Sequence, residues 1–230
     1  MGNTSSWIVL GSLVLSSLSI ACSSSSSAGG VTTDGGTASG DDGGSSVALD
    51  GGVATDASAE DAGPPRKVIF ITREFFDVKT SGFNGIAKAD ELCKSWADAK
   101  ASKVKGKTWK VWMSDSKTNA RDRLSNSALY VRVDGKVIGT LDDLTHGTMK
   151  NPVGLDEYGT AAVIMSSAVT GTAFDGQADT AGTCGDWLDT SPGREVTLGD
   201  PTKTDSSWTN SADFAEDCSS LGGQFYCVEQ

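Results

Sequence analysis

The stretch "NGIAKADELCKSWADAK", residues 84–100, decides the fold class of this chain. Four of its apolar residues recur at helical spacing and so fall on one face of a predicted helix: Ile86, Ala89, Cys93 and Trp96. Asn84 belongs to the residue types that commonly cap a helix at its N-terminus. The segment therefore predicts an amphipathic helix whose buried face carries a cysteine.

Strand patterns flank this helix on both sides. Upstream, "RKVIFITREFF" holds the apolar run Val68–Ile71 directly after two prolines, which predicts the first strand. Downstream, "TWKVWMSDS" alternates Trp109, Val111 and Met113 with other residues, as a strand does. We expect Trp109 to be a core residue, because tryptophans in small disulfide-bonded domains are more often packed than exposed.

Further along, the pattern is one of short elements and long loops. "TNARDRLS" predicts a helical turn opened by Thr118 or Asn119, and "LYVRVDGKVIG" predicts a hairpin around Asp134 and Gly135. "AAVIMSSAVTG" and "GQFYCVEQ" predict two later strands. The sequence predicts an α+β domain over residues 66–230, with one or two helices packed on antiparallel strands.

The chain before residue 66 has a different character. Residues 7–21, "WIVLGSLVLSSLSIA", have the length of a signal-peptide core, so residues 1–21 are expected to be a signal peptide. Ala21 before Cys22 resembles a bacterial lipoprotein cleavage site, which implies a lipid on Cys22 and attachment to a membrane. Two alternatives are N-myristoylation at Gly2 and an ordinary cleaved signal. Residues 22–65 contain almost no large apolar side chains, so we expect a disordered tether.

Charge narrows the range of partners. All 19 lysines and arginines follow residue 65, and residues 23–65 contain seven acids, so the tether is wholly acidic. The rest of the chain has 23 acids against those 19 bases. Phosphate and sulfate polymers need a positive face, so nucleic acid is not expected to bind, although a local basic patch remains compatible with the composition.

Four cysteines remain after Cys22: Cys93, Cys184, Cys218 and Cys227. An even number in an exported chain predicts two disulfides, and three pairings are open. A zinc site is the alternative, but no two of these cysteines form a CxxC pair and His146 is the only histidine.

Several segments, in order, carry a resemblance that covers the chain from about Val68 to Gln230: "GIAKADELCKSWADAK", "GKTWKVWMSDS", "ARDRL", "YVRVDGKVI", "VTGTAFDG", "CGDW" and "QFYCVE". In these segments the chain resembles a family of secreted bacterial domains of unknown function related to the C-type-lectin fold. It is also similar to the endostatin domain of certain collagens. The resemblance implies a C-type-lectin-like, or endostatin-like, fold with nested disulfides, Cys93 with Cys227 and Cys184 with Cys218. Endostatin-type zinc binding does not carry over, because the histidine cluster it needs is absent.

The sequence contains no complete motif for a catalytic triad or for a catalytic carboxylate pair. A nucleophilic triad would have to use His146, and no glycine-elbow serine accompanies it, so we expect a surface-loop histidine. Carboxylate pairs for glycoside hydrolysis could be drawn from Asp156, Glu157, Asp175 or Asp186, but their spacing does not indicate that any two flank a substrate. We therefore expect no enzymatic activity, and a hydrolase is the less favoured alternative.

The loops could bind a ligand without catalysing a reaction. Calcium is one candidate, because loop carboxylates supply the hard oxygen ligands that it prefers. The loops contain Asp175, Asp179 and Asp186, and "SWTN" places Trp208 and Asn210 in a pattern similar to the Trp-Asn-Asp strand of sugar-binding C-type lectins. The Glu-Pro-Asn loop of those lectins is absent, so ordinary solvated acids without a cofactor are the expectation and calcium the minority hypothesis.

These patterns lead to a functional hypothesis. We expect an outer-membrane or cell-surface lipoprotein whose domain binds a glycan or protein ligand without catalysis, through the loops between about Asp142 and Asp213. A structural envelope protein without a discrete ligand is the alternative.

Overall fold

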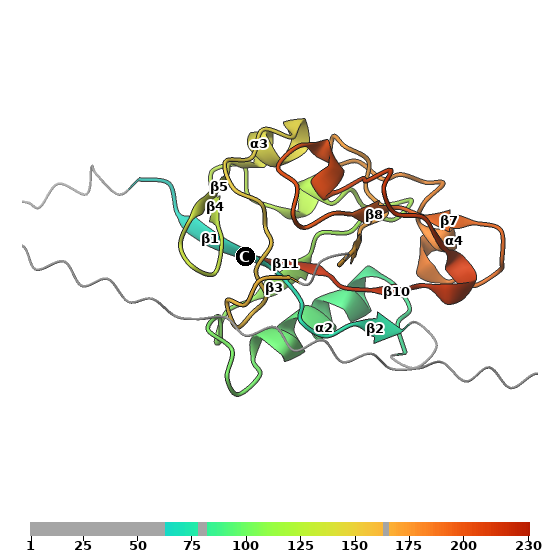
Figure 1. The fold of residues 1–230 in the computed structure, drawn as a ribbon, viewed down its shortest axis with the longest axis horizontal. Helices are drawn as coiled ribbons and strands as arrows, with labels where there is room; N and C mark the ends of the chain where they lie inside the picture. The colour runs from blue at the N-terminus through green and yellow to red at the C-terminus, as the bar shows by residue number, and fades with distance from the viewer. Residues whose placement is uncertain (1–62, 78–81, 163–165) are drawn as a thin grey trace, which may run out of the picture. The chain divides into compact units, whose positions relative to one another are not determined.

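A central five-stranded sheet organises the domain. The computed structural model describes residues 63–77, 82–162 and 166–230, so the predicted signal peptide, Cys22 and nearly all of the tether lie outside the described residues. The strand order is β3-β11-β1-β4-β5. The strands are β1 (Arg66–Ile71), β3 (Trp109–Val111), β4 (Leu129–Val131), β5 (Val137–Gly139) and β11 (Tyr226–Glu229). The predicted first strand and the Asp134–Gly135 hairpin are thus both present (Figure 1).

One strand pairing differs from the prediction of antiparallel strands. β1 pairs antiparallel with β11, Phe70 opposite Cys227, but it pairs parallel with β4, Lys67 opposite Tyr130. A parallel neighbour needs a long crossover connection, and the residues between β1 and β4 supply it, including the helix and β3. The sheet is therefore mixed.

Both faces of this sheet are buried. Side chains alternate along a strand, so Phe70 and Cys227 join one apolar cluster while Ile71 and Tyr226 join the other. This explains why the central strands are almost continuously apolar in sequence. It also explains why Trp112, on the opposite face of its strand segment from Trp109, is as fully enclosed as the predicted core residue.

The helix predicted from residues 84–100 is α2 (Ile86–Ala97), and it covers the first face. Its buried side chains Ala89, Cys93 and Ala97 pack into the cluster of Phe70. Asn84 does not cap it: the N-cap is Gly85, with φ of 123°, and no side chain caps that end. The predicted face is confirmed and the predicted cap is wrong.

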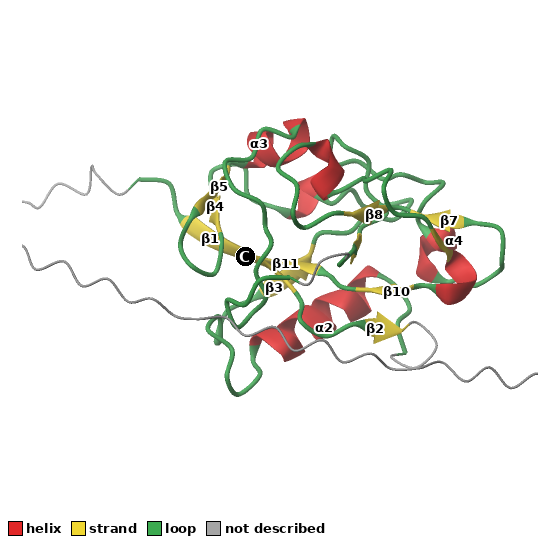
Figure 2. Cartoon of the chain, viewed as in Figure 1, coloured by secondary structure: helices red, strands yellow, loops and turns green. Residues whose placement is uncertain are grey.

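A second helix, α3 (Leu141–His146), covers the other face through Leu141 and Leu144. Figure 2 shows α2 and α3 on opposite sides of the central strands. In the described residues the remaining elements are short: three two-stranded sheets and several single helical turns. They are β2 (Phe76–Asp77) with β10 (Gly222–Gly223), β6 (Ala168–Val169) with β8 (Leu198–Gly199), β7 (Glu195–Val196) with β9 (Glu216–Asp217), α4 (Cys184–Trp187), η1 (Arg121–Arg123), η2 (Ser206–Trp208) and η3 (Cys218–Ser220).

Two disulfides join distant parts of this fold. Cys93 of α2 is bonded to Cys227 of β11, with a Cα–Cα distance of 5.6 Å. Cys184 is bonded to Cys218 across 5.7 Å. The pairing is the nested one implied by the resemblance, and the mixed α+β architecture is also confirmed.

The element α4 is left-handed, unlike an ordinary α-helix. Cys184, Gly185, Asp186 and Trp187 have φ of 46°, 59°, 58° and 70°, so the chain makes a single left-handed turn. Such a turn costs roughly 1–2 kcal/mol for each residue with a side chain. It is held by the Cys184–Cys218 disulfide and by the Trp187 indole, which donates a hydrogen bond to the Ser114 carbonyl at 3.0 Å.

Candidate functional site

A shallow trough runs along α3, and we call it the Arg121 trough. It joins two hollows of about 380 and 500 Å³ that share Arg121 and Thr145. The smaller hollow is completed by His146, Phe174 and Asp175. The larger extends past Asp142 and Thr140 to Leu141 and Asn126. Three segments far apart in the sequence therefore meet here: η1, α3 and the turn at residues 173–177.

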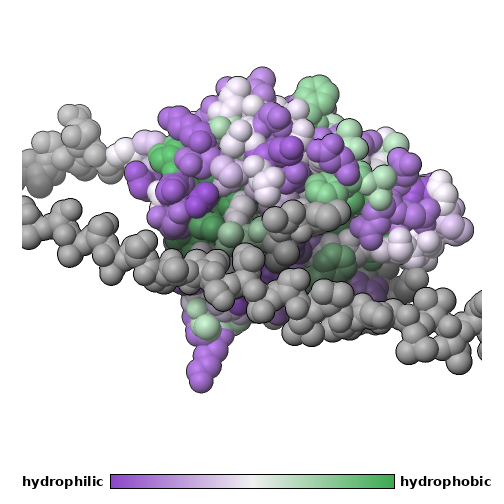
Figure 3. Space-filling model, viewed as in Figure 1, coloured by the Kyte–Doolittle hydropathy of each residue, from purple (hydrophilic) through white to green (hydrophobic). Residues whose placement is uncertain are grey.

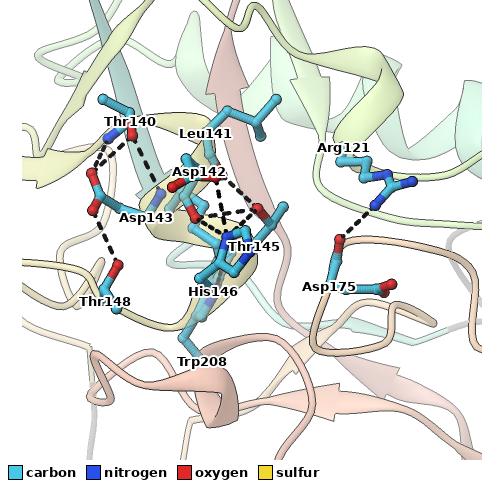
Figure 4. Close-up of polar contacts among 11 residues, drawn as sticks. Arg121, Thr140, Leu141, Asp142, Asp143, Thr145, His146, Thr148, Asp175 and Trp208 are labelled. Carbon is cyan, nitrogen blue, oxygen red and sulfur yellow. Dashed lines mark hydrogen bonds and ion pairs between the residues drawn. The ribbon is translucent and has the colours of Figure 1, made fainter.

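The wall formed by α3 is fixed by a capping box. The Thr140 hydroxyl accepts a hydrogen bond from the Asp143 backbone amide at 3.3 Å, and the Asp143 carboxylate accepts one from the Thr140 amide at 2.8 Å (Figure 4). Paired caps of this kind define the first turn of a helix. The C-cap that follows the helix is Gly147, which has φ of 65° and lies so close to Ser206 that a Cβ on Gly147 would be 2.4 Å from the Ser206 backbone nitrogen.

His146, the last residue of α3, has a defined hydrogen-bond arrangement. Its Nδ1 lies 2.9 Å from the Asp142 carbonyl oxygen and 3.2 Å from the Asp142 carboxylate. Since both partners are acceptors, we assign the hydrogen of the neutral ring to Nδ1, and Nε2 is left as an acceptor. The side chain is 67% exposed, so a ligand could reach it. His146 is a surface residue as predicted, but it lies on a helix rather than a loop.

The opposite wall is a tight turn with an aromatic side chain near its tip. The Ala173 amide donates to the Gln177 carbonyl at 2.8 Å, and the Gly176 amide donates to the Ala173 carbonyl at 3.0 Å. Phe174 and Asp175 lie between these bonds, and Phe174 is 63% exposed. Gly176, with φ of 81°, packs so closely on Arg121 and Thr145 that a Cβ would lie within 3 Å of each side chain.

Arg121 ties this turn to the floor of the trough. Its backbone amide donates to the Gly176 carbonyl at 3.1 Å. Its Nη1 donates to the Asp175 carbonyl at 3.3 Å, as Figure 4 shows. Burial opposes ionisation of Asp175, but hydrogen bonds from Gln177 and the charge of Arg121 outweigh it and hold its pKa below the usual range. The trough therefore presents a guanidinium, the carboxylates of Asp142 and Asp175, an imidazole acceptor and an exposed phenyl ring.

The five predicted ligand-loop residues are dispersed. Asp175 lies in the Arg121 trough, whereas Asp179 and Asn210 line a separate hollow of about 380 Å³. The Asp186 carboxylate accepts hydrogen bonds from the amide and hydroxyl of Ser116, at 2.7 and 2.6 Å. The structure does not bring the three acids together.

Trp208 requires a correction. Its side chain is fully buried, makes tilted ring contacts with Trp112 and Tyr226, and donates from its indole nitrogen to the Leu144 carbonyl at 2.9 Å. It supports α3 from beneath and offers no surface to a ligand. The similarity to the lectin strand therefore placed a core residue among the ligand candidates.

A metal centre is not assembled in the part of the chain that the structure describes. Within it, no group of three or more histidine, cysteine, aspartate or glutamate side chains is arranged to hold a metal ion. The Asp179 carboxylate instead accepts a hydrogen bond from the Thr197 hydroxyl at 2.7 Å.

The adjacent acids Asp156 and Glu157 have structural partners. Asp156 forms an ion pair with Arg73 at 2.7 Å, and its side chain is 5% exposed. Glu157 is fully buried and accepts a hydrogen bond from the Arg73 amide at 2.9 Å. A substrate does not reach either carboxylate without displacing these contacts.

Sequence reasoning missed Arg121 and Phe174. Arg121 is one of 19 basic residues, and nothing in "ARDRL" distinguishes it from Arg123. The signal for Phe174 was available: it stands directly before Asp-Gly, a turn pair, and an aromatic residue at a turn is exposed more readily than one inside a strand.

No family model matches the chain, and no curated protein matches it. In residues 63–77, 82–162 and 166–230, no helix is long and apolar enough to cross a membrane.

Proposed function

We propose that this chain is a membrane-anchored lipoprotein of the cell envelope whose domain binds a glycan without catalysis, through the Arg121 trough. The observation that supports this best is the exposed ring of Phe174 beside Arg121 and His146. Ligand sites typically combine an apolar surface with a few polar groups that fix orientation.

The chemistry of the trough favours a neutral, hydroxyl-rich ligand. Arg121 is a donor, the Asp142 and Asp175 carboxylates are acceptors, and His146 offers an acceptor nitrogen. A sugar hydroxyl both donates and accepts, so it can use this mixture, while an anionic ligand would be repelled by two carboxylates. The ring of Phe174 supplies an apolar face on which a sugar ring could stack.

The fold assignment within this proposal is C-type-lectin-like. It rests on the sequence segments that resemble that family, together with the mixed sheet, the helix α2 and the nested disulfides. The lipid anchor rests on Ala21 and Cys22. Both are open to direct test, and the mass of the mature N-terminal peptide tests the anchor: an unmodified serine at that end would contradict it.

Binding is best tested with the full chain on an array of neutral and acidic glycans, in calcium and in chelator. We expect Phe174→Ala to abolish binding to the neutral glycans that the native chain retains. Phe75→Ala is the matched control, because Phe75 is equally exposed, at 65%, but does not line the trough. It should leave binding unchanged.

The same experiment separates the alternatives. Equal loss in the two phenylalanine variants would count against the trough. Binding that disappears in chelator would favour calcium coordination by loop acids over the mechanism proposed here. If no glycan binds but a protein ligand is retained and Phe174→Ala releases it, the trough is a protein-binding site.

A further inference from the structure

A second surface of the domain has the opposite charge from the rest of the molecule. Residues 94–110 carry six lysines and a single acid, Asp98, although acids outnumber bases over residues 66–230. Four of these lysines lie in the loop Asp98–Thr108 that joins α2 to β3, and we call it the lysine loop: Lys100, Lys103, Lys105 and Lys107. All four are exposed.

The lysine loop is held in a fixed conformation by its other residues. Ser102 and Val104 are buried, which directs the intervening and following lysines outward. The Ser102 hydroxyl accepts a hydrogen bond from the Val104 amide at 3.2 Å, and the Lys103 amide donates to the Glu157 carbonyl at 2.9 Å. The loop is thus a shaped, positively charged projection, and Figure 3 shows a hydrophilic projection at the lower edge of the domain, where Figure 1 places the turn after α2.

Most of the positive charge on this projection is not neutralised by neighbours. Asp98 is already paired with Lys94 at 2.5 Å, and a hydrogen bond from Lys94 followed by one from Gly106 holds its pKa below the usual range. Lys107 pairs with Glu229 at 2.6 Å, and Lys105 donates to the Lys100 carbonyl. Within the described part of the chain, Lys100 and Lys103 have no ion-pair partner.

We propose that the lysine loop docks the domain on an anionic phospholipid surface. Ammonium groups near such a surface are each attracted by about 1 kcal/mol at physiological ionic strength. A bilayer is favoured over a soluble polyanion because the loop is a small projection on an otherwise acidic domain, which a flat surface can contact while the acidic remainder faces away. The inference does not depend on the ligand of the Arg121 trough.

The test uses the mature chain, residues 22–230, with Cys22→Ser, so that it carries neither the predicted apolar signal peptide nor the predicted lipid attachment site. We measure its co-sedimentation with vesicles of equimolar phosphatidylcholine and phosphatidylglycerol, and with vesicles of phosphatidylcholine alone. Binding is expected only to the anionic vesicles, and it should weaken as the salt concentration is raised. The triple variant Lys100→Gln, Lys103→Gln, Lys105→Gln should lower the partition coefficient at least roughly tenfold.

The matched control is Lys117→Gln, Lys136→Gln, Lys150→Gln, which removes three other exposed lysines and changes the net charge equally. It should retain most of the binding. Equal losses in the two triple variants, equal binding to both vesicles, or capture by soluble heparin without vesicle binding would each overturn the proposal. Phe174→Ala should leave vesicle binding intact, so failure of the glycan proposal is distinguishable from failure of this one.

Discussion

At the scale of single residues, the ion pair of Asp90 and Arg123 hydrogen-bonds the free backbone groups of β3, which is an edge strand of the central sheet. The Val111 amide donates to the Asp90 carboxylate at 2.8 Å, and Arg123 donates to the Val111 carbonyl at 2.6 Å. Arg123 and Asp90 also bind each other at 2.5 Å. Two side chains thus satisfy the backbone groups that a further strand would otherwise pair.

Arg123→Ala should therefore destabilise the domain by about 2–4 kcal/mol, because it leaves a partly buried carboxylate and a strand carbonyl without their partner. Urea unfolding would measure this as a lower midpoint with an unchanged slope. The control is Lys88→Ala, which breaks the exposed Lys88–Glu91 pair and should cost less than about 0.5 kcal/mol. Similar losses of stability in both variants would show that Arg123 does not stabilise the edge of the sheet.

Glu157 is expected to make the stability of the fold depend on pH. Its carboxylate is buried, and one of its oxygens has no hydrogen-bond partner in the described structure. Burial raises its pKa above the ordinary value of 4.5. The folded state then holds a proton that the unfolded chain releases, so this group's contribution to stability falls as pH rises from about 4.5 through the raised pKa.

Glu157→Gln should remove that dependence. The difference in melting temperature between the native chain and the variant is expected to shift in favour of the variant as pH rises, and then to become constant. Thermal unfolding followed across mildly acidic to neutral pH provides the measurement. A difference that does not vary with pH would mean that Glu157 titrates normally.

At the scale of elements, the left-handed turn α4 depends on a close approach by Gly171. This residue has φ of 56°, and a Cβ there would lie 2.5 Å from the Trp187 ring. Gly171→Ala should cost about 2–4 kcal/mol by combining backbone strain with displacement of Trp187. Gly193→Ala is the control, since its φ is 83° but its surroundings are open, and it should cost only about 1 kcal/mol.

Near-ultraviolet circular dichroism would report whether Trp187 has moved, alongside the urea midpoint. If Gly193→Ala lowered the stability as much as Gly171→Ala, the backbone strain that both variants share would account for both losses. In that case the packing of Trp187 against Gly171 would contribute little.

A helix or hairpin could be predicted from the sequence where its pattern lies within one short segment of the chain. The helix α2 and the Asp134–Gly135 hairpin carry their patterns within a dozen residues, so the sequence located both. The helix α3 is only six residues long and has no apolar periodicity that would predict it, although Thr140 and Asp143 have the spacing of a capping box. The Arg121 trough was only partly predictable, because η1, α3 and the 173–177 turn are brought together by tertiary packing alone.

At the scale of the whole molecule, two covalent links hold the domain together. They enclose sequence separations of 134 and 34 residues, which correspond to roughly 5 and 4 kcal/mol in the chain-entropy model. Replacing Cys93 and Cys227 by serine should therefore lower stability somewhat more than replacing Cys184 and Cys218. Thermal unfolding of the two double variants, compared with the native chain with and without reductant, would measure the order.

The smaller link has an additional role, since it restrains the left-handed turn. If the Cys184–Cys218 variant proved the less stable of the two, release of α4 would outweigh the loop-length effect. Peptide mapping without reductant should find the same two bonds in the native protein. Four free thiols would contradict both the pairing and the exported location proposed for the chain.

The interior position of β11 also bears on when the protein can fold. Tyr226–Glu229 lie between β1 and β3, so β3 has no strand partner in the sheet until these residues have been synthesised. A nascent chain that stops short of residue 226 can form α2 but cannot bury either face of the sheet. In the exported lipoprotein that we propose, the domain would therefore cross a secretion channel before its sheet forms, and it would complete its fold only after residues 226–229 have emerged.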